Sequence, residues 1–278
     1  MTSLQLRSPA KLNLFLHITG RREDGYHELQ TLFQLLDFGD EMRITATDDS
    51  ALTVSCPQLQ LPEQQNLAWR AAELLRKHCK SGAGAHITID KRIPAGGGLG
   101  GGSSNAATVL LALNQLWELG LSRAKLGQLG LKLGADVPLF VHGRSAWAEG
   151  IGEQLEPVEI PASHYLVVAP ACAVATAEVF SHRQLTRNTS PITIAAFFEG
   201  GAPNDCESVV RQLYPEVDKA LIWLGKFGQP QLTGTGSCVF SAYASRAEAE
   251  AVKDQLPDNW QGFVASGINE SPLLKVLG

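Results

Sequence analysis

The chain has 278 residues, of which 44% are hydrophobic, enough for one large or two modest domains. Its net charge of −5 argues against the basic surface of a nucleic-acid-binding protein, and its apolar stretches are too short or too polar to span a bilayer. The five cysteines are scattered without a C-x-x-C pair, and the first residues lack the pattern of a signal peptide. We therefore expect free thiols in a reducing cytoplasm, without a disulfide scaffold or a zinc site.

The chain opens with predicted strands. Residues 12–18 and 29–36 are apolar runs bounded by turn signals, with a polar loop at 20–25 between them. A further pair of strands is predicted at 41–47 and 52–55, joined at residues 48–50. A helix is predicted over residues 66–80, because the apolar residues there recur on one face.

Two pairs of polar residues stand out in this region. Lys11 and Asn13 are two positions apart on a predicted strand, so their side chains point to the same face. Taken alone, they are best explained as a solvated strand face. Tyr26 and His27 follow the polar loop and could stack on and hydrogen-bond a nucleobase. A half-buried tyrosine and a surface histidine are the alternative.

A glycine-rich segment, residues 94–104, lies between a predicted strand at 86–89 and an apolar helical run at 105–116. Glycines let the backbone approach oxygen anions, and free N–H groups at a helix start point at them, so the segment predicts a phosphate-binding loop. Ser103 stands where a Walker loop needs lysine, and the acidic residue of a dinucleotide fingerprint is missing. Either Ser103 or Ser104 could also be a helix N-cap.

Asp136 lies among small and apolar residues just before Pro138, which predicts a partly buried carboxylate at a helix junction. Such a carboxylate is either an N-cap or, beside a lysine, a general base. The sequence does not tell whether Lys11 and Asp136 meet. The preceding helix is predicted at 123–133, with Ser122 as its cap.

The second half of the chain mixes short strands and helices. Strands are predicted at 165–168 and 262–265, and a helix is predicted at 245–255. The glycine turn at 234–236, between two short strands, is either a tight hairpin or part of a site. The mixed order favours an α+β fold, and a change of composition predicts a domain boundary near residue 155.

These segments, in this order, resemble the motifs of the GHMP kinases, the family of galactose, homoserine, mevalonate and phosphomevalonate kinases. Residues 94–104 are similar to the ATP loop of that family, 232–240 to its third motif and 8–13 to its first. The resemblance implies the two-domain α+β GHMP kinase fold. In that fold, residues 1–155 would form an ATP-binding domain like the second domain of ribosomal protein S5. Residues 156–278 would form a ferredoxin-like, substrate-binding domain.

The resemblance also implies a reaction, in which ATP and Mg²⁺ serve to phosphorylate an alcohol. Segments 9–14, 24–27 and 134–138 are similar to the branch of the family that acts on a CDP-linked methylerythritol, a small molecule of the non-mevalonate route to isoprenoid precursors. In that branch the tertiary 2-hydroxyl of the methylerythritol unit receives the phosphate. No nucleic-acid or membrane partner is expected.

Roles for single residues follow from the same resemblance. Asp136 would be the general base and Lys11 its charged partner near the transferred phosphate. Asn13 would orient the substrate, His27 would hydrogen-bond the cytosine, and Tyr26 and Phe180 would stack on its two faces, with Thr176 close by. The ATP site would comprise Asn66, Lys91, Pro94, Gly96, Gly97, Gly98, Leu99, Gly100, Gly101, Gly102, Ser103 and Ser104. The protein ligands of Mg²⁺ stay unknown, with Ser103 and Ser104 as candidates.

Three other functions are weighed against this one. A different kinase of the family would act on another small alcohol, although mevalonate and homoserine have no use for a base-stacking pair. A non-catalytic nucleotide-binding protein would not need both Lys11 and Asp136. A nucleotide-dependent oxidoreductase is disfavoured by the missing ribose-binding acidic residue.

Overall fold

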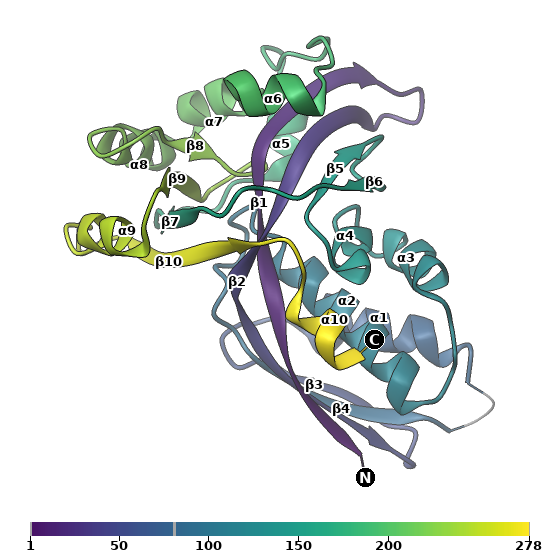
Figure 1. Cartoon of the computed structure of the whole chain (residues 1–278). Helices are drawn as coiled ribbons and strands as arrows, with labels where there is room; N and C mark the ends of the chain where they lie inside the picture. The colour runs from purple at the N-terminus through teal and green to yellow at the C-terminus, as the bar shows by residue number, and fades with distance from the viewer. Residues whose placement is uncertain (1, 80–81, 278) are drawn as a thin grey trace.

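The computed structural model describes residues 2–79 and 82–277. Two long antiparallel strands, β1 (Ser3–Arg21) and β2 (His27–Thr47), run through the whole molecule (Figure 1). The other strands are β3 (Leu52–Ser55), β4 (Gly84–Asp90), β5 (Ala146–Glu149), β6 (Gln154–Pro157), β7 (His164–Ala169), β8 (Gln231–Leu232), β9 (Val239–Tyr243) and β10 (Gln261–Ile268). The sheet follows the order β3-β4-β2-β10-β7-β9-β8, and it branches at β2, which also pairs with β1 and β5.

The helices gather in two groups around this sheet. Figure 1 shows α1 to α4 and α10 beside the half that holds β3 and β4, and α5 to α9 around the other half. Their bounds are α1 (Leu67–Arg76), α2 (Gly101–Leu116), α3 (Arg123–Leu131), α4 (Val137–His142), α5 (Thr176–Ser181), α6 (Ile194–Gly200), α7 (Glu207–Leu213), α8 (Pro215–Leu224), α9 (Arg246–Lys253) and α10 (Pro272–Leu277), with a 3₁₀ turn at Glu63–Gln65. The helix α2 is buried on all sides over residues 104–113, as expected for a helix inside a core.

The predicted pairing of residues 41–47 with 52–55 is wrong. Both segments are strands, but β4 lies between them, antiparallel to β2 and parallel to β3. A parallel pair needs a crossover connection, and α1 provides it between β3 and β4. The crossover lays the apolar face of α1, with Ala68, Ala71 and Leu75 buried, onto the core. Burial of this apolar face stabilises the fold more than direct pairing of the two strands through the short turn at residues 48–50 would.

Several helix ends differ from the expectation. The helix α2 begins at Gly101, so the last glycines and both serines of the glycine-rich segment belong to its first turn. Its N-cap is Gly100, and therefore neither Ser103 nor Ser104 is the cap. The helix α1 ends at Arg76, and the predicted end at Lys80 lies outside the described residues. The Ser122 cap is confirmed, because its side chain accepts from the Lys125 amide. The strands β5 and β6 and the helix α10 were not predicted.

The core consists of three clusters that link the two halves of the chain. The first lies beneath α1 and α2, and the second packs around α7, α8 and β9. The third contains Leu12 from β1, Phe240 from β9 and Ala265 from β10.

The domain boundary near residue 155 stays a prediction. The strand β10 pairs with β7 from the second half of the chain and with β2 from the first, so the sheet is continuous across the two halves. Over residues 2–79 and 82–277, no helix is long and apolar enough to cross a membrane.

Candidate active site

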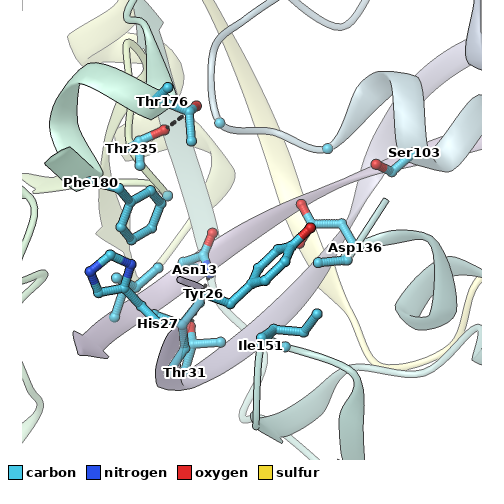
Figure 2. Close-up of a pocket in the computed structure, with 18 of the residues that line it drawn as sticks. Asn13, Tyr26, His27, Thr31, Ser103, Asp136, Ile151, Thr176, Phe180 and Thr235 are labelled. Atoms are coloured by element: carbon cyan, nitrogen blue, oxygen red, sulfur yellow. Dashed lines mark hydrogen bonds between the residues drawn. The ribbon is translucent and has the colours of Figure 1, made fainter. Parts of the chain in front are cut away.

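A cleft of about 700 Å³ collects most of the motifs singled out above. It is lined from β1 by Lys11 and Asn13, from the glycine-rich segment by Gly98, Gly100 and Ser103, and by Asp136. It is also lined by Tyr26, His27, Thr176, Phe180 and Thr235. Figure 2 shows Ser103 and Asp136 on one side of the cleft and His27 and Phe180 on the other.

Lys11 lies where three segments of the chain converge. Its ammonium group donates to the Asn13 Oδ1 atom at 2.6 Å and lies 3.3 Å from the Asp136 Oδ2 atom. The same Nζ atom lies 5.2 Å from the centre of the Phe33 ring. The Lys11 side chain is 4% exposed and that of Asp136 is 32% exposed. The expectation that Lys11 and Asn13 share a face is confirmed, but that face is buried and not solvated.

Asp136 occupies the N-cap position of α4, but its side chain makes no capping hydrogen bond. The carboxylate therefore does not cap the helix, which was the alternative to a role as general base. The Asn13 side-chain amide is fixed in turn, because it donates to the Thr31 hydroxyl at 3.0 Å. Together these contacts give the cleft a held ammonium group beside a carboxylate that solvent and substrate can reach.

The glycine-rich segment turns sharply before it enters α2. Gly98 and Gly100 have φ values of 77° and 71°, a region that side chains disfavour. A Cβ atom on Gly98 would lie 2.2 Å from the Thr233 carbonyl oxygen, so another residue cannot fit there. Because Gly100 caps α2 without a side chain, the first amides of the helix are open to an anion. The Ser103 side chain lies at this helix start and lines the cleft.

The second glycine turn, at 234–236, lies against the first. It belongs to the predicted hairpin, which is confirmed by the pairing of β8 with β9. The backbone amide of Cys238 donates to the Gly97 carbonyl at 3.2 Å. The Thr233 hydroxyl accepts from the backbone amide of Asn13 at 3.0 Å. Thr235 shares a 2.9 Å hydrogen bond with Thr176 at the start of α5. This turn thus joins the glycine-rich segment, β1 and α5 around one cleft.

Lys91 and Ser104 are held inside the protein, away from the cleft. Lys91 donates to Asp40, a fully buried carboxylate on β2, at 2.5 Å. Asp40 also accepts from the Arg92 and Ile93 amides and from the Asn105 side chain. The buried hydroxyl of Ser104 accepts from the Ser8 hydroxyl at 2.8 Å. Both residues thus support the glycine-rich segment from behind, and their expected place in the ATP site stays a prediction.

The remaining residues of the expected ATP site do not line the cleft, and all of them except Asn66 belong to the glycine-rich segment itself. Asn66 is the N-cap of α1 and accepts from the Ala68 amide at 2.9 Å. Leu99 is buried, and its carbonyl accepts from the Lys11 amide at 3.1 Å. Gly96 and Gly102 are exposed, Pro94 and Gly101 are partly exposed, and Gly97 is buried. Backbone groups and not side chains therefore form most of this surface.

The other end of the cleft is aromatic. Tyr26 is 59% exposed, on the loop that joins β1 and β2. The imidazole of His27 is stacked on Phe180, with the ring centres 5.1 Å apart (Figure 2). Phe180 was expected to lie opposite Tyr26, and in the structure the ring against it is His27. Burial, followed by the charges of Arg187 and Arg21, lowers the pKa of His27 below its usual value.

Arg187 is a residue of this end that the sequence did not reveal. Its Nε atom donates to the His27 Nε2 atom at 3.2 Å. It lies in a stretch without periodicity or glycine turns, so no local signal marks it. Thr31 was missed because its partner, Asn13, lies on the neighbouring strand. Thr233 lies in the segment 232–240 that the sequence singled out, but its contact with Asn13 was not predicted because the two residues are 220 positions apart.

Comparison with known proteins gives matches over nearly the whole chain. The model of the GHMP kinases N terminal domain matches residues 66–144, and that of the GHMP kinases C terminal matches residues 187–262. A protein of Alkalilimnicola ehrlichii named 4-diphosphocytidyl-2-C-methyl-D-erythritol kinase is 55% identical over 267 residues, 96% of this chain and 92% of the relative. A protein of Hahella chejuensis with the same name is 52% identical over 286 residues, 99% of this chain and 97% of the relative.

A solved structure is similar over the same extent. It is described as a crystal structure of 4-(cytidine 5'-diphospho)-2C-methyl-D-erythritol kinase. It matches with a TM-score of 0.83 at 33% identity, covering 95% of this chain and 99% of the solved chain.

Proposed function

Since the chain belongs to the GHMP kinase family and has its two-domain fold, we propose that it is a 4-diphosphocytidyl-2-C-methyl-D-erythritol kinase. It transfers the γ-phosphoryl group of ATP to the 2-hydroxyl of the methylerythritol unit, a step of the non-mevalonate route to isoprenoid precursors. The observation that supports this function most directly is the ion pair of Lys11 and Asp136, whose Nζ and Oδ2 atoms are 3.3 Å apart. It lies in the cleft that Tyr26 and His27 also line.

The reacting end of the cleft supplies a base and a cation. Asp136 takes the proton of the substrate's 2-hydroxyl while the hydroxyl oxygen forms a bond to the γ-phosphorus of ATP. The bond between the γ-phosphorus and the oxygen that bridges it to the β-phosphate breaks, which releases ADP. Lys11, fixed by Asn13, stabilises the charge of the phosphoryl group in transfer. The open amides at the start of α2 bind the phosphates.

The Mg²⁺ ion expected with ATP would take few of its ligands from the protein. Over the described residues, no group of three or more acidic, histidine or cysteine side chains could hold a metal, so phosphate oxygens and water would supply most ligands. Ser103 lines the cleft and is the serine placed to contribute, whereas the Ser104 hydroxyl is buried against Ser8. Mg²⁺ would offset the negative charge of the phosphates.

The aromatic end recognises the cytidine part of the substrate. Tyr26 stacks on the base, His27 hydrogen-bonds it, and Phe180 and Thr176 complete the wall from α5. The partner of the protein is thus a small CDP-linked molecule. The five cysteines are free thiols, which supports a place in the reducing cytoplasm.

An ATP-consumption assay with three alcohols tests this function. Purified protein with Mg²⁺ and ATP is given CDP-methylerythritol, mevalonate or homoserine in parallel reactions. We expect turnover with the cytidine compound alone. Turnover with another alcohol would retain the kinase and reject the base-binding end, and no turnover despite ATP binding would reject the catalytic function.

A further inference from the structure

One guanidinium group organises the aromatic end of the cleft. Arg187 uses its Nε–H to donate to the His27 Nε2 atom at 3.2 Å. Its two Nη atoms donate to three backbone carbonyls, those of Leu185 at 3.0 Å, Phe180 at 2.9 Å and His182 at 2.8 Å. The same side chain therefore holds the imidazole, the end of α5 and the segment that follows.

This contact fixes the protonation pattern of the imidazole. A guanidinium group stays protonated in proteins and is a donor without acceptors, so His27 Nε2 must present its lone pair to Arg187. A neutral imidazole then carries its proton on Nδ1. The charged groups that face this ring are Arg187 from the segment after α5 and Arg21 from β1, while α5 contributes the uncharged Phe180 ring. Burial and both arginines lower the pKa of His27, which favours the neutral ring.

We propose that Arg187 is a positioning residue that makes the cleft select cytosine over uracil, by leaving the His27 imidazole with a donor and no acceptor for the base. The inference rests on the proposed function and adds the origin of its base specificity. Both bases carry an acceptor at O2, so the contact that selects between them is at N3, where cytosine presents an acceptor that can receive the Nδ1–H. Uracil presents its own donor at N3, and two donors cannot pair. A His27 free to change tautomer would accept from uracil as readily as it donates to cytosine.

The matched variants separate holding the tautomer from holding the loop. Arg187→Gln replaces a fixed donor with an amide that can either donate to Nε2 or accept from it, so both tautomers become available. Arg187→Lys keeps a cationic donor, but its three N–H groups cannot serve His27 and the three carbonyls at once. Arg183→Gln removes the same charge from an exposed arginine of the same segment and is the control.

The measurement is the affinity for CDP and UDP, by calorimetry with the ATP site filled by a non-hydrolysable ATP analogue. We expect the wild type and Arg183→Gln to bind CDP more tightly than UDP by about tenfold or more, the effect of one misplaced hydrogen bond. Arg187→Gln should bring this ratio to within about threefold of unity. Arg187→Lys should weaken both ligands and keep the ratio, a split that a general loss of structure would not produce.

The ¹⁵N NMR spectrum of the histidine side chains gives a second readout, on wild-type protein and without catalysis. A proton on His27 Nδ1 supports the inference, and a proton on Nε2 overturns it even if Arg187→Gln fails to fold. An unchanged CDP-to-UDP ratio in Arg187→Gln also overturns it. If the ratio behaves as expected but CDP-methylerythritol is not phosphorylated, the proposed function fails and the base selection stands.

Discussion

Lys11 shows why a charged side chain lies inside this protein. A buried ammonium group loses its hydration, and it is stable only when other groups replace that water. Asn13, Asp136 and the Phe33 ring surround it here. Asp136 remains partly open to solvent, so this group of side chains can act on a molecule that enters the cleft.

Asp136→Asn should remove the base and keep both binding ends. The amide has nearly the same shape but cannot take the proton of the 2-hydroxyl, so kcat should fall by about 10²- to 10⁴-fold. The dissociation constants of ATP and of the cytidine substrate should change little, as calorimetry can measure. Turnover near the wild-type rate would contradict the assignment of the base.

Tyr26→Ala should act on the KM for the cytidine substrate and spare the fold. The ring is mostly exposed without ligand, so its loss costs little stability. Stacking of a base on an aromatic ring contributes about 1–3 kcal/mol, which corresponds to roughly a 5- to 150-fold rise in KM. Steady-state kinetics give the value, with Tyr26→Phe as the control that keeps the stack. A KM equal to that of the wild type would reject stacking by Tyr26.

Among the elements, the glycine-rich segment depends on a carboxylate behind it. Asp40 binds the Arg92 and Ile93 amides before the segment and the Asn105 side chain after it. Both ends of the phosphate-binding segment are thereby fixed to β2. The sequence predicted the segment itself, because its glycines are adjacent, but it did not reveal Asp40, whose partners lie more than fifty positions away.

Asp40→Asn should destabilise the protein and loosen the ATP site. Its amide group would turn a donor towards donors, including the buried Lys91 ammonium group. Disrupting a buried pair of this kind costs about 3–5 kcal/mol. Urea unfolding measures this loss, and Asp90→Asn, which removes an exposed partner of Arg92, should cost at most about 1 kcal/mol. Equal effects of both variants would reject the anchoring by Asp40.

At the scale of the whole molecule, local patterns predicted elements better than their partners. Apolar runs and turn residues identified β2, β3 and β9, yet β4 came between two strands that the sequence suggested as neighbours. The site followed the same rule. The roles of Lys11 and Asp136 came from the resemblance to the family motifs, and their meeting depends on how α4 packs against the rest of the fold. Arg187 had no local signal at all.

The stability of the whole molecule should fall in mild acid because of His17. This side chain is buried, and neither ring nitrogen has a hydrogen-bond partner within the described structure. Burial lowers the pKa of His17, with a smaller opposing effect from Asp205. As the pH falls below about 6.5, the pKa of histidine in the unfolded chain, His17 becomes protonated in the unfolded protein but stays neutral in the folded protein. The free energy of unfolding should therefore decrease by up to about 1.4 kcal/mol per pH unit from this residue.

His17→Phe tests this contribution through a slope. The ring already packs edge-on against Phe15, so an apolar ring suits the site. Urea unfolding between pH 5 and 8 should show a shallower acid decline in the variant, whatever its stability at pH 8. His27, whose pKa is also lowered, should account for part of the remaining decline. Parallel pH profiles for both proteins would contradict the explanation.

The position of β10 has a consequence for synthesis of the chain on the ribosome. This strand lies between β2 and β7, yet it is translated after both of them. Until residues 261–268 emerge, β7 presents an edge with unpaired backbone groups and β2 a short one at Leu35 and Leu36, and unpaired edges of this kind favour aggregation. The two halves of the sheet therefore become joined through β10 only after nearly all of the strands and helices described here have been made.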